Sequence, residues 1–139
     1  MSSSGAISAF NRTRGTCLAQ DVRLARSHWT RLRGLIGTEE STFRSGQALL
    51  IVPCRGVHTL AMRFPLDVIY LDRSSRVVRI AENLEPWRFA PVEFSASSAL
   101  ELPAGTIQRC GTAVGDEVEI VGANPSQDPE QDLEEEQAA

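Results

Sequence analysis

From residue 48 onwards, hydrophobic and polar positions follow the two-residue period of β-strands rather than the period of a helix. The clearest case is Glu117-Val-Glu-Ile-Val121, whose strict alternation is typical of a half-exposed antiparallel strand. Other short apolar runs, separated by polar, Pro or Gly positions, also predict strands: 17–19, 22–24, 48–52, 57–63, 68–71, 77–81 and 99–102. Together they predict a mainly β fold, either a small antiparallel β-sandwich or a partly closed barrel.

Segment 27–36 has a different pattern and predicts one short N-terminal helix. Ser27 can cap its start and Gly37 can end it. Its apolar residues fall on one face of such a helix: Trp29, Leu32, Leu35 and Ile36. A single further helical turn is predicted at 106–110.

The chain divides into three parts by composition. Residues 1–15 are Ser-rich and lack periodicity, which predicts a disordered lead-in. Residues 16–121 predict a single β domain. Residues 122–139 hold six acidic residues and no basic one, so that too little apolar surface is available to offset the entropy of ordering. We therefore predict a disordered acidic tail.

Charged residues are distributed unevenly along the chain, and this makes nucleic acid a candidate partner. All 14 basic residues are Arg, and nine of them lie in the first 63 residues. An Arg-rich front could contact phosphates. The net charge of −4 and the acidic tail oppose this, because the tail would compete for the same surface. Nucleic-acid association through the N-terminal part is therefore the weaker alternative.

Location and cofactors are constrained by what the sequence lacks. No apolar run approaches the ~20 residues of a membrane span, and the N-terminus shows no secretory signal pattern. The three cysteines form no CxxC pair, which predicts reduced thiols, no metal site, no cofactor and a cytoplasmic protein. Cys54, His58 and Met62 recur every four residues, but on a strand they would lie roughly 13 Å apart, too far to share one ion.

The stretch Val57-His-Thr-Leu-Ala-Met-Arg-Phe-Pro-Leu-Asp67 brings polar residues beside an apolar run. Arg63 and Asp67 flank Pro65, where the chain should bend. The pair could pin this corner, or Arg63 could clamp an anionic ligand that Asp67 orients. His58 is a further candidate, with a hydrogen-bonded structural imidazole as its alternative role.

Two other places are candidate sites. Glu101 alternates with Leu100 and Leu102 along the predicted strand and therefore points to the other face, where a carboxylate is usually solvated. If it met Asp67 in a pocket, the two could act as the acid and base of a small hydrolase or lyase. The predicted loop 83–91 carries Trp87 and Arg88, which could hold a sugar face, a base or a partner side chain.

Several motifs occur in a specific order: Arg-Leu-Arg-Gly-Leu-Ile-Gly37, His58-Thr-Leu-Ala-Met-Arg-Phe-Pro-Leu-Asp67, Ala99-Leu-Glu-Leu-Pro-Ala-Gly105 and a late Gly-Asp turn. In this set the chain resembles the family called domain of unknown function 192 over about residues 16–121. The resemblance implies a compact β-sandwich-like fold. It implies no established activity, substrate or catalytic residue.

No GxSxG, P-loop or GxGxxG motif is present. The sequence has an aromatic loop but no assembled catalytic motif. This combination favours a non-enzymatic accessory module that binds a small ligand or a protein. The small hydrolase or lyase based on Asp67 and Glu101 stays the alternative. The sequence makes no prediction of oligomeric state.

Overall fold

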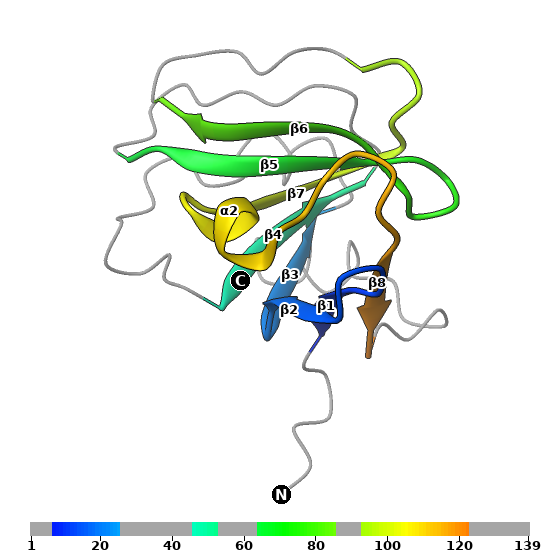
Figure 1. Cartoon of the computed structure of the whole chain (residues 1–139), viewed down its shortest axis with the longest axis horizontal. Helices are drawn as coiled ribbons and strands as arrows, with labels where there is room; N and C mark the ends of the chain where they lie inside the picture. The colour runs from blue at the N-terminus through cyan, green and yellow to red at the C-terminus, as the bar shows by residue number, and fades with distance from the viewer. Residues whose placement is uncertain (1–6, 26–45, 53–63, 86–92, 123–139) are drawn as a thin grey trace, which may run out of the picture.

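The structure, a computed structural model, describes residues 7–25, 46–52, 64–85 and 93–122. This part of the chain forms two β-sheets and one short helix (Figure 1). The small sheet has the order β2-β1-β8 and consists of β1 (Ser8–Asn11), β2 (Thr16–Ala19) and β8 (Val118–Val121). The large sheet has the order β3-β4-β7-β5-β6 and consists of β3 (Asp21–Ala25), β4 (Gln47–Ile51), β7 (Ser98–Pro103), β5 (Leu66–Leu71) and β6 (Val77–Leu84). The helix is α2 (Thr106–Cys110).

The middle strands of the large sheet are buried on both faces. All six side chains of β5 are buried, and so are the four central ones of β7. Because successive side chains of a strand point to opposite faces, these strands contribute to two separate apolar clusters. Ile69 and Leu100 belong to the first cluster, whereas Val68 and Ala99 belong to the second.

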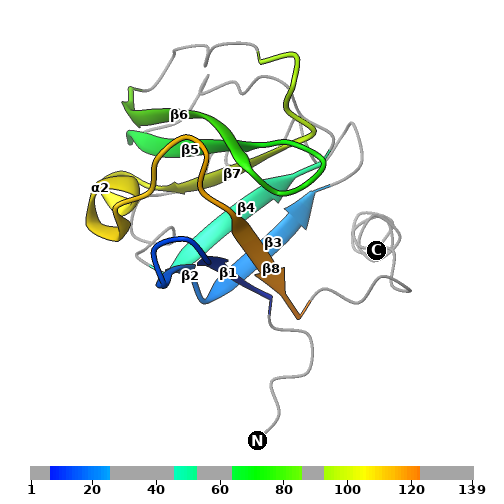
Figure 2. The same cartoon turned by 45° about the vertical axis from the view of Figure 1, so that its right-hand side comes forward.

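The first cluster lies between the large sheet, the small sheet and α2. Leu18 of β2, Val118 of β8 and Ile107 of α2 pack into it, each no more than 2% exposed. Figure 2 shows the strands of the small sheet crossing below the large sheet, with α2 beside β5 and β7. Full burial of such a side chain contributes roughly 1.5–3 kcal/mol, so this cluster holds the two sheets together.

The mainly β prediction is confirmed, as a two-sheet arrangement without a closed barrel among the described residues. The helical turn at 106–110 is present as α2. The predicted helix at 27–36, the predicted strand at 57–63 and nearly all of the predicted tail lie outside the described residues. Within the described ranges, no helix has the length and apolar character needed to cross a membrane.

Two features differ from the prediction. Strand β1 lies inside the segment 1–15 that was predicted to be disordered. Its order comes from pairing with β2 on one side and β8 on the other, which no local pattern reveals. In addition, β3 and β4 pair in parallel, and the 21 residues between them are long enough for the crossover that a parallel pair requires.

Candidate functional site

Asp67 is a fully buried carboxylate that joins three segments of the chain. Its Oδ1 accepts a hydrogen bond from the backbone N–H of Asn83 at 2.8 Å. Its Oδ2 accepts two more, from Gly105 at 3.1 Å and Ile107 at 2.9 Å. The carboxylate at the start of β5 thus fixes the end of β6 and the first turn of α2 at the same time.

The local backbone explains why these three amides need an acceptor. Pairing between β5 and β6 changes register between Leu66 and Val68, so the regular ladder is interrupted at Asp67. Asn83 is left-handed there, with φ of 51°, and Gly105 has φ of 94°. Asp67 supplies the acceptor that a strand partner would otherwise provide for Asn83. The amides of Gly105 and Ile107 lie at the start of α2, where the first N–H groups have no acceptor within the helix.

Gly105→Ala should destabilise the protein by about 1–2 kcal/mol, because residues with a Cβ rarely adopt a left-handed backbone. No atom lies within 4 Å of the Cβ that the substitution would add, so strain in φ is the expected cause. Urea denaturation measures the change. Gly46→Ala has the same φ of 94° and equally open surroundings but no bond to Asp67. A much larger loss for Gly105→Ala than for Gly46→Ala would contradict φ strain as the sole cause.

Glu101 is the second buried acid, and its surroundings are very different. It lies on the central strand β7, opposite Leu49 of β4 and Val68 of β5, and is 4% exposed. Burial raises the pKa of Glu101 to about 8. The expectation that Glu101 is solvated was wrong, because both faces of the large sheet are buried.

No hydrogen bond or ion pair joins the Glu101 side chain to another described residue. Yet within the described ranges, every side-chain oxygen or nitrogen that is sealed from solvent has a hydrogen-bond partner. The small remaining exposure of Glu101 therefore reaches its carboxyl oxygens. Burial among apolar side chains, with the raised pKa that it causes, favours the protonated form of this carboxyl group at neutral pH.

Asp67 and Glu101 lie on different faces of the large sheet. Asp67 is opposite Leu102 in the β5–β7 ladder, whereas Glu101 is opposite Val68. Opposite residues of a ladder share a face and neighbouring residues do not, so the two carboxyl groups point to opposite sides of the sheet. The structure thus separates the acid and the base of the predicted hydrolase.

A third polar cluster was not predicted. Asn11 is fully buried, and its Nδ2 donates to Thr112 Oγ1 and Asp116 Oδ2, both at 2.9 Å. Asp116 Oδ2 also accepts from Arg14 Nε and the Ala113 N–H, both at 3.0 Å. Burial alone would raise the pKa of Asp116, but these hydrogen bonds and the Arg14 charge outweigh it and lower the pKa. The cluster links the β1–β2 turn to the segment before β8, and the Gly-Asp turn was its only sequence signal.

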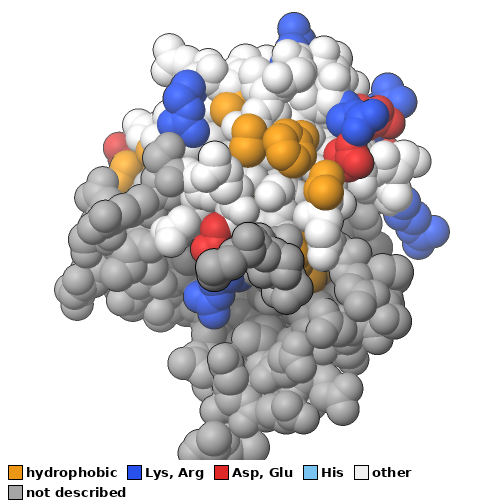
Figure 3. Space-filling model, turned by 90° about the horizontal axis from the view of Figure 1, so that it is seen from below, with side chains coloured by type: hydrophobic (Ala, Val, Ile, Leu, Met, Phe, Trp, Pro, Cys, Tyr) orange, Lys and Arg blue, Asp and Glu red, His pale blue; other side chains and the backbone are white. Residues whose placement is uncertain are grey.

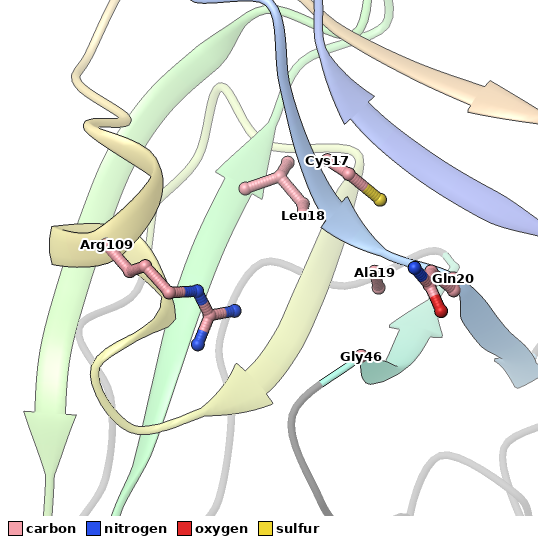
Figure 4. Close-up of a pocket in the computed structure, with 6 residues that line it drawn as sticks. All are labelled: Cys17, Leu18, Ala19, Gln20, Gly46 and Arg109. Atoms are coloured by element: carbon pink, nitrogen blue, oxygen red, sulfur yellow. The ribbon is translucent and has the colours of Figure 1, made fainter.

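A shallow hollow of about 270 Å³ lies between β2, α2 and the start of β4 (Figure 4). Arg109 extends over it from α2, and no described carboxylate forms an ion pair with that guanidinium. The Cys17 thiol lies on the other side of β2 and points away from Arg109. Besides Arg109, the hollow is lined by Cys17, Leu18, Ala19, Gln20 and Gly46, and the Cys17 thiol is not directed at the guanidinium.

The remaining predicted site residues, His58, Arg63, Trp87 and Arg88, lie outside the described residues. Their roles stay predictions. Among the residues that the structure does describe, no three His, Cys, Asp or Glu side chains gather as metal ligands would.

Fold and site together define a two-sheet β domain with a bracketing carboxylate, Asp67, and a further buried acid, Glu101, that has no hydrogen bond to another described residue. The DUF192 family model, described as "Uncharacterized ACR", matches residues 9–120. The chain therefore belongs to the DUF192 family. It is 34% identical over 116 residues to a UPF0127 protein of Pyrococcus furiosus, covering 78% of this chain and 94% of that one. It is 30% identical over 114 residues to a UPF0127 protein of Thermococcus sibiricus, covering 78% and 71%.

Two solved structures are similar in fold. A protein of unknown function from Novosphingobium aromaticivorans matches with a TM-score of 0.70 and 24% identity, over 81% of this chain and 82% of that one. A protein from Sinorhizobium meliloti, described as a "putative transcription regulator", matches with a TM-score of 0.66 and 25% identity, over 88% and 100%. The family and these relatives establish the fold, and none of them establishes an activity.

Proposed function

We propose that the domain is a non-enzymatic binding module for a small, largely apolar molecule that carries one basic group. The observation that carries the proposal is Glu101, a nearly buried acid without a described polar partner on an apolar sheet face. Its surroundings are Leu49, Val68 and the other members of the second cluster, which would contact the apolar body of the ligand.

A basic group is the chemistry that suits this acid. Burial of an ionised carboxylate is costly unless a cation accompanies it. An ammonium group that enters beside Glu101 would allow the carboxyl group to ionise, and an apolar chain would bury further surface. Binding would therefore release a proton below the pKa of about 8.

The other functions are less well supported by the geometry. An acid–base enzyme would need Asp67 and Glu101 on one side of the sheet, and they lie on opposite sides. Nucleic-acid binding would suit the description of the Sinorhizobium meliloti protein. However, two residues of the Arg-rich front are already paired, Arg12 with Glu119 and Arg14 with Asp116. Arg63 and the 83–91 loop remain proposed contributors to the binding module.

The test is the pH dependence of binding for three probes of matched length: octylamine, octanol and octanoate. We expect octylamine to bind, with an affinity that rises about tenfold per pH unit between pH 6 and 8, because Glu101 must lose its proton. Calorimetry in buffers of different ionisation enthalpy should show the released proton. Saturation at 100 times the dissociation constant should add about 2.7 kcal/mol to the free energy of unfolding.

Two variants complete the test. Glu101→Gln should abolish the preference for the amine and its pH dependence, whereas Glu82→Gln, at an exposed position of β6, should leave both unchanged. Equal binding of amine and octanoate, or an amine affinity independent of pH, would contradict the proposal.

A further inference from the structure

Arg109 is an exposed cation whose usual role at the end of a helix is already filled by other groups. It lies in the last turn of α2, where a basic side chain commonly bonds the last helical carbonyls. In α2, three of these carbonyls already accept hydrogen bonds, from the N–H groups of Gly111 and Thr112 and from the hydroxyl of Thr16. No hydrogen bond or ion pair joins the Arg109 guanidinium to another described residue, so its donors are available to a ligand.

The guanidinium extends over the hollow of about 270 Å³ between α2 and β2 (Figure 4). Gln20 and Gly46 line the hollow on the side away from α2. Gly46 has φ of 94°, and no atom lies within 4 Å of the position that a Cβ would occupy there. The exposed Gln20 carboxamide forms no hydrogen bond with another described residue. The hollow thus has a cation on one side and a neutral hydrogen-bonding group on the other.

The size of the hollow limits the ligand to a small molecule. A volume of 270 Å³ corresponds to roughly nine water molecules at ~30 Å³ each. Pockets for drug-sized ligands are larger, typically about 300–1,000 Å³. The hollow therefore suits an acid with a short carbon chain rather than a nucleotide or a lipid.

We propose that this hollow binds the carboxylate group of a small organic acid. The planar guanidinium of Arg109 can donate two parallel hydrogen bonds to the two carboxylate oxygens. The NH₂ group of Gln20 can donate a further one from the opposite side.

Charge favours a carboxylate over a phosphate. Among the described residues that line the hollow, Arg109 contributes the only charged side chain. Its single positive charge balances the single negative charge of a carboxylate, whereas a phosphate group carries about −1.5 to −2 at pH 7. The excess negative charge would lie beside the carbonyl end of α2, which is itself partially negative.

This site is independent of the ligand proposed for Glu101. Ile107 of α2 packs into the first apolar cluster, whereas the neighbours of Glu101 belong to the second. Binding of a small acid over Arg109 should therefore be unaffected by Glu101→Gln. Failure of either proposal would leave the other in place.

The outer face of the small sheet decides which acids are suitable probes. Phe10 and Val121 are 37% and 41% exposed there. Seen from below, hydrophobic side chains of the molecule gather beside charged ones (Figure 3). An acid with a long apolar chain would also adsorb to such a surface. Acetate and propionate avoid this, because they have little apolar surface.

The experiment is a titration of the ¹⁵N-labelled full chain with acetate and propionate, followed by nuclear magnetic resonance at constant ionic strength. We expect the Arg109 Nε–H and Gln20 NH₂ signals to shift along one saturation curve, with a dissociation constant on the order of 1–10 mM. Propionamide has the shape of propionate without its charge and should give no saturable shift. Inorganic phosphate should bind more weakly than either acid.

Protein variants test the role of the guanidinium. Arg109→Gln should weaken propionate binding at least tenfold, and Arg109→Lys, which keeps the charge but loses the planar fork, about threefold. The matched control is Arg73→Gln, at an exposed position in the β5–β6 turn, which should leave the affinity unchanged. The proposal is overturned if neither acid gives a saturable shift, if propionamide or phosphate binds as well as propionate, or if Arg109→Gln retains the wild-type affinity.

Discussion

Glu101→Gln is expected to stabilise the protein by roughly 3–5 kcal/mol at pH 8, and by progressively less as the pH is lowered towards 5. In the folded protein, burial raises the pKa of Glu101 from 4.5 to about 8. Between these values the unfolded chain has lost the proton that the folded chain retains, so wild-type stability falls as pH rises, by about 1.4 kcal/mol per pH unit. Glutamine has nearly the same shape as the protonated acid and does not titrate.

The measurement is urea denaturation of both proteins at pH 5, 6, 7, 8 and 9. The difference in free energy of unfolding should be about 1 kcal/mol or less at pH 5, grow up to pH 8 and then level off. Glu82→Gln controls for the loss of an exposed carboxylate and should show no such growth. A difference that is the same at every pH would show that Glu101 has an ordinary pKa and would remove the main support for the proposed site.

The stability that the protein is expected to lose at neutral pH because of Glu101 bears on the function of this residue. An acid that destabilises the fold at neutral pH is better explained by binding than by packing, because Gln or Leu could fill the same position at lower cost. The same substitution should therefore separate the two properties, with stability rising while amine binding is lost. Simultaneous loss of stability and binding would instead indicate that Glu101 has an essential structural partner.

Strand alternation predicted part of the architecture well. The runs around β5 and β7 were found from their own residues, since apolar periodicity reflects burial directly. Alternation also placed Glu101 correctly on the face opposite Leu100 and Leu102. It could not show that this face is buried too, because that depends on which strands flank β7.

The partners of the polar residues could not be predicted, because they are distant in sequence. Asp67 binds amides 16, 38 and 40 residues away. Asn11 binds side chains 101 and 105 residues away, within a segment whose Ser-rich composition suggested disorder. Such contacts follow from register and sheet order, which a single sequence does not specify.

Asp67→Ala is expected to destabilise the protein by about 3–5 kcal/mol, a large part of the 5–15 kcal/mol typical of a domain. The substitution leaves three backbone amides, of Asn83, Gly105 and Ile107, without their acceptor, and each unsatisfied buried group costs about 1–3 kcal/mol. Urea denaturation measures the loss. Asp21→Ala, at an exposed position of β3, should change stability by less than about 0.5 kcal/mol.

Asp67→Asn keeps the assay informative if the alanine variant does not fold. Its amide oxygen can still accept from the amides on one side, but its NH₂ group then faces an N–H donor, so an intermediate loss of about 2 kcal/mol is expected. Hydrogen exchange should locate the damage, with faster exchange at Asn83, Gly105 and Ile107. Because Asp67 and Glu101 face opposite sides of the sheet, the asparagine variant should still bind octylamine with the wild-type pH dependence. Loss of amine binding in a folded Asp67→Asn protein, with its three amides still protected, would show that Asp67 belongs to the binding site rather than to the bracket.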